Sequence, residues 1–586
     1  FKENNFYKPE VGFYGGQRNF ILKVPPKTFN LFLATEASSK SILDLMYIGL
    51  TRINPVTSEI VPNLAESWEI KKDKKTYLFK LRKKLQWSDD VPLTANDVVF
   101  TFNQIINNPD IPNNYRESLL VNGKFPIVEK LDNLTIRFKT SKPFVPFLRN
   151  LNIPIIPEHV FDYLIEKDDN GKLPLWNWGN LETNPLYIVC NGPFELEKYF
   201  PEKSVVLSKN KNYWRKDHDD KQLPYFDKVT FDIDPRKDQE YYSFMTKGTD
   251  TLWLTESTRL FETLLQSTHD KKGYSVYNLG QSKSNSFVMF NQSKAKDKNN
   301  KQLVNPVKSE WFRNLKFRKA LAYAIDKKSI AAKVYNGLAV PVNSMIHRQS
   351  PFYNHSLRDY SFNLLQAKKL LHEAGFKNNQ KGLLFDSKGN PVEIEFITNE
   401  DNDLRDRTCR AIKAGWEKLG IKVNYKTRPF SEIMNKIKQT LQWDAIFIGF
   451  SGIDPDPHSN KNIWQLDGKM HMFNIGNPSQ STRWKSHETS YQSWEKDISV
   501  LAEKAAMEFD FNKRKKLYYK IQELELKHLP FIYTVQPINL IATSDKLGNF
   551  FPSINSESNF GVTTWNIDEQ FIKPDKKVRF TYVSSN

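Results

Sequence analysis

Hydrophobic and polar residues alternate over several short segments of the chain. Residues 76–82 read Thr-Tyr-Leu-Phe-Lys-Leu-Arg, and residues 134–139, 228–233 and 392–397 show the same alternation. Successive side chains of a β-strand point to opposite faces, so this period is typical of strands with one buried face. The pattern predicts a β-strand at each of these positions.

Other segments place their apolar residues at the spacing of a helix. Residues 363–375 end in Gly375, which suits the left-handed conformation that closes many helices. One face of this segment carries Leu364, Ala367, Leu371 and Ala374. The pattern predicts a helix here and a second helix over residues 316–335, stopped by Asn336 and Gly337.

A third helix is predicted from about residue 404 to residue 419, with its end at Gly420. Directly after it, Ile421, Val423 and Tyr425 alternate with polar residues as in a strand. A helix that leads straight into a strand is one step of an α/β unit.

The texture of the chain changes along its length. Residues 1–280 are rich in strand patterns, whereas helix and strand patterns alternate regularly from about residue 305 to about residue 530. The polar segment Lys294–Lys301 near this change predicts an exposed loop. We therefore expect an α/β protein with two lobes of different texture.

Composition and length fit a globular protein of this kind. The chain has 586 residues, of which 39% are hydrophobic and 26% charged, and its longest apolar runs are far shorter than the roughly 20 residues that cross a bilayer. The net charge of +18 raises the alternative of a protein that binds nucleic acid or another polyanion. The basic runs 71–75 and 513–516 are short and scattered, which favours a solvated basic surface.

Only two cysteines occur, Cys190 and Cys409. They exclude a disulfide scaffold and a four-cysteine zinc site. We expect two buried, unbridged thiols, because a bridge between lobes would obstruct hinge motion.

Recognisable catalytic motifs are missing from the sequence. It contains no phosphate-binding Gly-x-x-x-x-Gly-Lys-Ser/Thr loop, no Gly-x-Ser-x-Gly nucleophile elbow and no His-Glu-x-x-His zinc helix. His458 and His471 lack a third ligand at useful spacing, so we expect no metal and no cofactor. A hydrolase that uses Asp454 and Asp456 as acid and base stays open as a distant alternative.

Several sequence blocks in fixed order resemble the family 5 solute-binding proteins, which include receptors for oligopeptides, dipeptides and nickel complexes. The blocks cover nearly the whole chain. They are Pro62–Glu69, Lys75–Arg82, Leu85–Asp90, Pro92–Phe100, Asn191–Phe194, Asn210–Trp214, Phe317–Asp326, Ala367–Gly375 and Leu419–Val423.

The resemblance implies a two-lobed fold like that of the type II periplasmic binding proteins, in the large peptide-receptor class. Lobe I would comprise residues 1–283, with an inserted strand-rich subdomain at about 56–170, and lobe II residues 284–530. Residues 531–586 would return to lobe I, so that two crossings form a hinge.

The resemblance also implies a function. A monomeric, exported receptor that is not an enzyme would close its lobes around a peptide or peptide-like solute and deliver it to the permease subunits of an ABC transporter. A metal chelate, an oligosaccharide or a modified peptide is the alternative cargo. Whether a lipid anchor precedes Phe1 is left open.

By resemblance, one candidate ligand-binding segment lies in lobe I. Thr35, Glu36 and Ser38 fall where family members hold an extended ligand with backbone groups and small polar side chains. A polar turn before a helix is the alternative interpretation. Asn191 and Asn291 are further candidate ligand-binding residues.

The second candidate segment is residues 442–457, a buried strand that leads into a proline-rich turn. Peptide-binding relatives carry an aspartate after this strand that pairs with the ammonium group of the peptide. Here Ile453 occupies the aligned position, Asp454 follows it, and Phe447 replaces a basic residue. Asp454 is the candidate ammonium partner, and capping of the turn is the alternative for Asp454 and Asp456.

Two aromatic residues complete the candidates. Phe450 and Trp464 offer apolar surface to a ligand, although large aromatic residues lie more often in the core.

Overall fold

The computed structural model describes residues 7–574, except 112, 114, 237–238, 247, 255–272, 298, 401, 451–453, 477–489, 554 and 556–559. The chain divides into two compact units. Unit 1 comprises residues 1–279 and 539–586, and unit 2 comprises residues 280–538.

Unit 1 contains two four-stranded sheets. The first has the order β1-β10-β9-β8, with β1 (Gln17–Leu22), β8 (Phe194–Phe200), β9 (Ser204–Lys209) and β10 (Lys228–Ile233). The second has the order β4-β5-β7-β6, with β4 (Ala65–Ile70), β5 (Thr76–Leu81), β6 (Ile127–Lys130) and β7 (Thr135–Lys139). The second sheet lies within the expected subdomain range, and the predicted strands at 76–82, 134–139 and 228–233 are confirmed as β5, β7 and β10.

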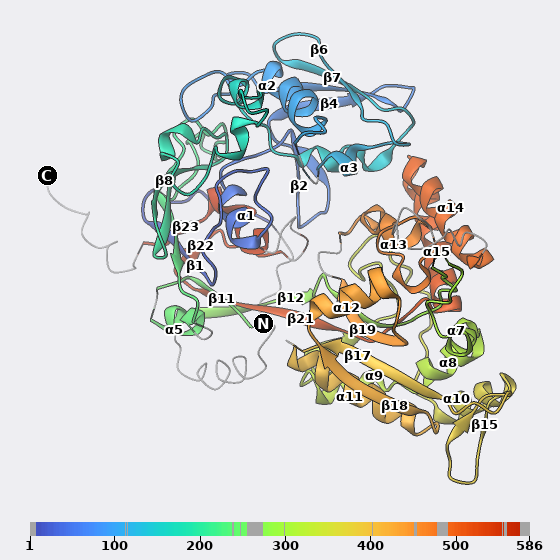
Figure 1. Cartoon of the computed structure of the whole chain (residues 1–586). Helices are drawn as coiled ribbons and strands as arrows, with labels where there is room; N and C mark the ends of the chain where they lie inside the picture. The colour runs from blue at the N-terminus through green and yellow to red at the C-terminus, as the bar shows by residue number, and fades with distance from the viewer. Residues whose placement is uncertain are drawn as a thin grey trace, which may run out of the picture. The chain divides into compact units, whose positions relative to one another are not determined.

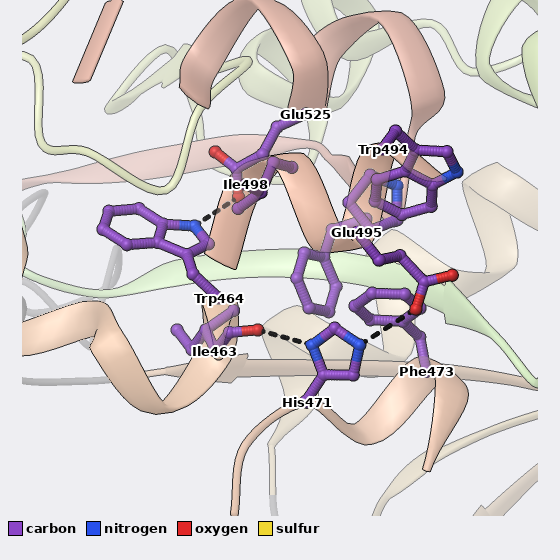
Figure 2. A pocket seen from close by; sticks show the side chains of 10 residues that line it. Ile463, Trp464, His471, Phe473, Trp494, Glu495, Ile498 and Glu525 are labelled. Carbon is purple, nitrogen blue, oxygen red and sulfur yellow. Dashed lines mark hydrogen bonds and ion pairs between the residues drawn. The ribbon is translucent and has the colours of Figure 1, made fainter. Parts of the chain in front are cut away.

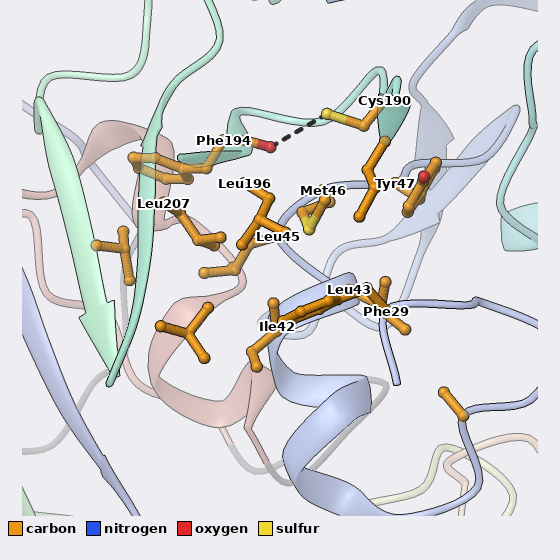
Figure 3. Close-up of a cluster of buried hydrophobic side chains, with 14 of the residues drawn as sticks. Phe29, Ile42, Leu43, Leu45, Met46, Tyr47, Cys190, Phe194, Leu196 and Leu207 are labelled. Atoms are coloured by element: carbon orange, nitrogen blue, oxygen red, sulfur yellow. Dashed lines mark hydrogen bonds between the residues drawn. The ribbon is translucent and has the colours of Figure 1, made fainter. Parts of the chain in front are cut away.

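Short helices accompany these sheets. They include α1 (Ala37–Leu43), α2 (Ala95–Phe100), α3 (Tyr115–Leu119), α4 (Glu158–Phe161) and α5 (Gln239–Met245). Figure 3 shows Ile42 and Leu43 of α1, and Leu45 and Met46 after it, in one apolar cluster with Phe194, Leu196 and Leu207 of β8 and β9. This packing fixes α1 and the segment that precedes it.

Unit 2 is built on one five-stranded sheet of the order β18-β17-β19-β13-β20. Its strands are β13 (Asn285–Phe290), β17 (Glu393–Asn399), β18 (Lys422–Arg428), β19 (Ala445–Phe450) and β20 (Phe531–Tyr533). β17 runs parallel to β18 and β19, and β13 runs antiparallel to β19 and β20. The predicted strand at 392–397 is confirmed as β17.

Helices cover both faces of this sheet because its strands are apolar on both. Phe396 and Phe447 pack with residues of α8 (Leu315–Tyr323), α10 (Leu364–Glu373) and α11 (Asp403–Glu417). Ile397 and Ile446 pack with residues of α12 (Phe430–Asn435), α13 (Lys461–Trp464), α14 (Ser493–Met507) and α15 (Phe511–His528). Figure 1 shows α11 and α12 on opposite sides of β17.

The predicted helix at 363–375 is confirmed as α10. Asn363 caps its first turn by accepting the backbone N–H of Gln366 at 2.9 Å, and Gly375 has φ +89° just beyond its end. The predicted helix at 404–419 is confirmed as α11, and Gly420, with φ +87°, leads into β18.

The single helix predicted at 316–335 is wrong, because the chain breaks there into α8 and α9 (Lys327–Lys333). The Asp326 carboxylate starts α9 by accepting the backbone N–H of Ser329 at 2.9 Å. The next residue, Lys327, is buried and pairs with Asp359 at 2.7 Å. The spacing of apolar residues alone does not reveal that Asp326 caps a new helix.

The chain passes between the units twice, in β12 (Tyr274–Gln281) and β21 (Val535–Ser544), which are neighbours in one sheet that also contains β11 (Thr251–Trp253) and β14 (Ala339–Pro341). Residues 531–538 lie in unit 2, not in the C-terminal return, because β20 pairs with β13 and the start of β21 pairs with β14. Within the described part of the chain, no helix combines the length and apolar character of a membrane span.

Candidate ligand-binding site

The candidate segment of unit 1 precedes α1. The Glu36 carboxylate accepts the backbone N–H of Lys27 at 3.1 Å and the hydroxyl of Ser39, and the Ser38 hydroxyl donates to the Pro25 carbonyl at 3.2 Å. Burial raises the pKa of Glu36, but these hydrogen bonds outweigh it, and the net shift is downward. Glu36 and Ser38 therefore hold the turn, whereas the side chain of Thr35 is exposed.

Asn191 and Asn291, two of the predicted ligand contacts, are hydrogen-bonded within their own units. Asn191 is buried in unit 1, where its Oδ1 accepts the backbone N–H of Ile48 at 2.8 Å. Asn291 is fully buried in unit 2, where its amide donates to the carbonyls of Leu441 and Trp443 at 2.8 and 3.0 Å. Both amides thus hold backbone segments in place, and a ligand contact at either residue stays a prediction.

The edge of the unit 2 sheet gathers the chemistry expected of a binding site. β17, β18, β19 and β20 all end at this edge, since they run in one direction. In α/β sheets, ligands bind beyond the carboxyl ends of parallel strands. The strands end here in Asn399, Arg428, Phe450 and Tyr533.

Phe450 is half-buried at this edge. Its ring lies 4.9 Å from that of Phe287 and 6.3 Å from that of Phe531, measured between centroids. The Phe450 ring therefore packs against core aromatic residues and remains partly exposed at the end of β19.

Asp454 and Asp456 follow the same strand, after residues 451–453, which lie outside the described part. Asp454 is half-buried, and its Oδ1 accepts the backbone N–H of Asp456 at 2.7 Å. Asp456 in turn accepts the backbone N–H of His458 at 2.9 Å. Both carboxylates thus cap the turn, as the alternative interpretation of the sequence holds.

Asp456 has a second partner in the side chain of Arg514. The two guanidinium nitrogens lie 2.8 Å from the two carboxylate oxygens, a bidentate pair. Arg514 is buried, so the expectation that the basic run 513–516 is entirely solvated is wrong at this residue. Arg514 belongs to α15, and only the tertiary fold brings its side chain to the turn that contains Asp456.

Trp464 lies in the core of unit 2, in agreement with the alternative interpretation of this aromatic residue. Its side chain is buried, and its Nε1 donates to Oε1 of Glu525 at 2.9 Å (Figure 2). Burial raises the pKa of Glu525 to about 7, against the hydrogen bond from Trp464.

These residues line a small cavity together with His471 and Glu495. Figure 2 shows His471 between the Ile463 carbonyl, 2.9 Å from Nδ1, and the Glu495 carboxylate, 3.1 Å from Nε2. The cavity measures about 10 Å³, room for about one water and far less than a ligand site needs. It is therefore not the binding site.

Both cysteines lie in the interior of the protein, away from solvent. Cys190 and Cys409 are buried and unbridged, as predicted, and burial raises the pKa of both thiols well above the usual range. Over the described residues, no group of His, Cys, Asp and Glu side chains is arranged to hold a metal ion.

Sequence reasoning missed Arg405, at the start of α11 and close to the strand edge. Its Nη1 donates to Oδ1 of Asn399 at 2.7 Å. The sequence contains the capping Asn402 just before it, but Arg405, Arg407 and Arg410 look alike without the fold.

Two α/β units joined by two neighbouring strands, with polar groups at the carboxyl edge of a sheet, define a two-lobed binding protein. The description "Bacterial extracellular solute-binding proteins, family 5 Middle" matches residues 59–471, more than half of the chain. The chain belongs to this extracellular solute-binding family, which confirms the family and fold class expected from its sequence.

Individual proteins agree with this assignment. The chain is 28% identical to the "Probable ABC transporter-binding protein" of Deinococcus radiodurans, over 90% of this chain and 89% of the relative. It is 26% identical to the "Dipeptide-binding protein" of Escherichia coli, over 85% of each chain. The periplasmic binding protein MelB of Agrobacterium fabrum, solved with stachyose, has the same fold, with a TM-score of 0.72 at 20% identity over 98% of this chain and 87% of that one.

Proposed function

We propose that this protein is the substrate-binding receptor of an ABC importer and that its cargo is a peptide or a peptide-like solute. The observation that carries the proposal is the family match, together with relatives over nearly the whole chain that are named for ABC transport and dipeptide binding. The protein works as an exported monomer outside the cytoplasmic membrane, where it passes its ligand to the permease subunits.

The mechanism needs two units and a hinge. The units are connected by β12 and β21, and a ligand that makes contacts with both units shifts the population towards a closed form. The permease recognises that form. No covalent step is required.

A hydrolase is not supported by the geometry of the turn. The Asp456 carboxylate is engaged by Arg514 and by the backbone of His458, so it is a poor partner for Asp454 in acid-base chemistry. The buried thiols are equally poor nucleophiles.

Asp454 is the proposed partner of the ligand's ammonium group. It is half-buried beyond the apolar strand β19, where a carboxylate favours a cationic partner. Asp454→Asn should weaken the binding of an amino-bearing ligand by about 1.5 to 3 kcal/mol. Titration calorimetry with a peptide that native mass spectrometry finds in the purified protein measures this loss.

Asp456→Asn is the matched control variant. It should reduce ligand affinity less than Asp454→Asn, because the Asp456 carboxylate pairs with Arg514 within unit 2. Equal and small losses in both variants would remove the ammonium role from Asp454. They would also favour a cargo other than a free peptide.

Closure is tested by small-angle X-ray scattering. A saturating peptide that stabilises the protein in a thermal-shift screen should reduce its radius of gyration. An unchanged radius at saturation would contradict the closing mechanism.

A chelate or an oligosaccharide is the second candidate cargo. It is favoured by Ile453 at the position where peptide receptors carry aspartate and by the stachyose-bound structure of the same fold. Thermal shifts with such compounds, and none with peptides, would support it.

A further inference from the structure

The lysines of residues 71–75 are joined in the fold by lysines from a distant part of the chain. Residues 71–75 form the turn between β4 and β5, at one end of the β4-β5-β7-β6 sheet of unit 1 (Figure 1). Lys139, the last residue of β7, lies at the same end because it pairs with Thr76. Thr140 donates its backbone N–H to the carbonyl of Lys75 at 2.9 Å and its hydroxyl to the carbonyl of Lys142 at 2.7 Å. Six lysines meet here and form a lysine cluster: Lys71, Lys72, Lys74, Lys75, Lys139 and Lys142.

The turn that carries four of these lysines is held by its own aspartate. The Asp73 carboxylate accepts the backbone N–H groups of Lys75 and Thr76, each at 2.9 Å, and the Thr76 hydroxyl at 2.8 Å. These hydrogen bonds lower the pKa of Asp73, so its carboxylate stays ionised and keeps its role in the turn at neutral pH. The backbone of the lysine cluster is thus fixed by the fold.

Several charges of the lysine cluster lack a counter-ion within the protein. Lys71 pairs with Glu69 at 2.7 Å. Lys72, Lys139 and Lys142 are exposed and form no ion pair with another described residue. Elsewhere in unit 1, Lys209, Lys211 and Lys228 each lie 2.8 to 2.9 Å from a carboxylate oxygen. The lysine cluster is therefore a local excess of positive charge, which attracts anions.

Protection of the sheet edges does not explain this excess. Lysines on an edge strand keep that strand from pairing with another chain. Lys139, however, belongs to β7, a central strand, and Lys142 lies in the loop beyond it. Ile127 of the edge strand β6 pairs in register with Lys139, and its side chain is 56% exposed. Lysines beside an exposed apolar side chain suit the boundary between lipid headgroups and water.

We infer that the lysine cluster binds anionic lipid headgroups and holds the protein at a membrane surface. The inference goes beyond ligand binding, because it concerns where the receptor resides between two rounds of delivery. The chain belongs to an extracellular family, so intracellular nucleic acid is not the polyanion that it meets. The exposed side chain of Ile127 favours a lipid surface over a soluble polyanion.

The test measures binding of the full-length protein to vesicles by co-sedimentation. One set of vesicles contains about one third phosphatidylglycerol in phosphatidylcholine, and the other contains phosphatidylcholine alone. The protein should bind the anionic vesicles and not the neutral ones. Binding should disappear at about 1 M salt, where the screening length falls to about 3 Å.

Two triple variants remove the same charge from different places in unit 1. The combination of Lys72→Gln, Lys139→Gln and Lys142→Gln should weaken binding to the anionic vesicles by about 100-fold, since each lysine near such a surface contributes about fivefold. The control combines Lys209→Gln, Lys211→Gln and Lys228→Gln, whose lysines are paired with carboxylates. It should weaken binding by less than about fivefold.

The apolar contact is tested separately. Ile127→Gln should weaken binding to the anionic vesicles by about threefold, because the isoleucine no longer enters the headgroup region, and should leave binding to heparin unchanged. Binding of heparin without binding of the anionic vesicles would assign the lysine cluster to a soluble polyanion and overturn the inference.

Other outcomes also overturn it. Equal binding to both kinds of vesicle, or equal losses in the two triple variants, would mean that the lysine cluster does not recognise anionic lipid. Thermal unfolding shows whether the first triple variant folds. If it does not, Lys142→Gln alone, which lies outside every strand, should still lose about fivefold in vesicle binding, and no loss would contradict the inference.

Discussion

Glu569 in unit 1 and Glu525 in unit 2 are both buried glutamates, but they differ in the groups that surround them. In unit 1, Glu569 accepts hydrogen bonds from Arg215 and Tyr7, and the Arg215 guanidinium also lies 2.6 Å from Asp568. In unit 2, Glu525 accepts a hydrogen bond from a neutral donor, the Trp464 indole, at 2.9 Å.

Burial acts on the pKa of both acids, and a cation opposes it at one of them. Burial raises the pKa of Glu569, and Arg215 opposes that shift. Burial also raises the pKa of Glu525, to about 7, and no cation opposes it. Arg215 thus offsets part of the cost of burying the Glu569 carboxylate, whereas the Glu525 carboxylate is buried without such an offset.

The largest effect is expected from Arg215→Met in unit 1. Removing the guanidinium leaves Asp568 and Glu569 buried without their cation, which should cost about 3 to 5 kcal/mol of unfolding free energy. Urea unfolding followed by tryptophan fluorescence measures the loss. Arg236→Met is the control, since solvent screens its surface pair with Asp234 and the loss of unfolding free energy should be far smaller than for Arg215→Met.

A small loss of unfolding free energy in both variants would mean that the contacts of Arg215 with Asp568 and Glu569 do not stabilise the packing of the C-terminal segment on unit 1.

The next effect is pH-dependent and belongs to Glu525. Its pKa is raised from 4.5 to about 7 on folding, so the folded state retains a proton that the unfolded state releases. Stability should therefore fall as pH rises from about 4.5 to about 7, by a total of about 3 kcal/mol. Glu525→Gln should abolish this fall and be the more stable protein at about pH 8.

Unfolding free energies across this pH range, for wild type and variant, provide the measurement. Glu523→Gln, on the exposed face of the same helix, should leave the wild-type pH profile unchanged. A profile that persists in Glu525→Gln would assign the titration to another group.

A smaller effect is expected from Asp456→Asn, which tests a paired acid inside unit 2. Asparagine still caps the turn, but the bidentate pair with the buried Arg514 is lost, at a cost of about 2 kcal/mol. Differential scanning calorimetry should show a lower Tm. An unchanged Tm would mean that water replaces the carboxylate without penalty.

The smallest effect on stability is expected from Asp454→Asn. Asparagine can still accept the backbone N–H of Asp456, so the unfolding free energy should change by no more than about 0.5 kcal/mol. The same calorimetry applies. A large loss would give Asp454 a structural role and weaken its assignment to the ligand.

Much of the local architecture was predictable from the sequence. The alternation at 76–82 and 228–233 predicts β5 and β10, and Asn363 and Gly375 delimit α10, because period, caps and left-handed glycines act within a few residues of the chain. The order of the sequence blocks was enough for the family.

The roles of single polar side chains were decided only by the tertiary structure. Asp454 and Asp456 are two residues apart and look equivalent in sequence, yet a residue on a distant helix, Arg514, engages Asp456. The burial of Asn291 and Trp464 and their hydrogen-bond partners became visible only in the fold. Arg405 is distinguished from Arg407 and Arg410 only by the ion pairs that those two arginines form. Burial and charge pairing depend on residues far apart in the chain, and a local pattern carries no information about them.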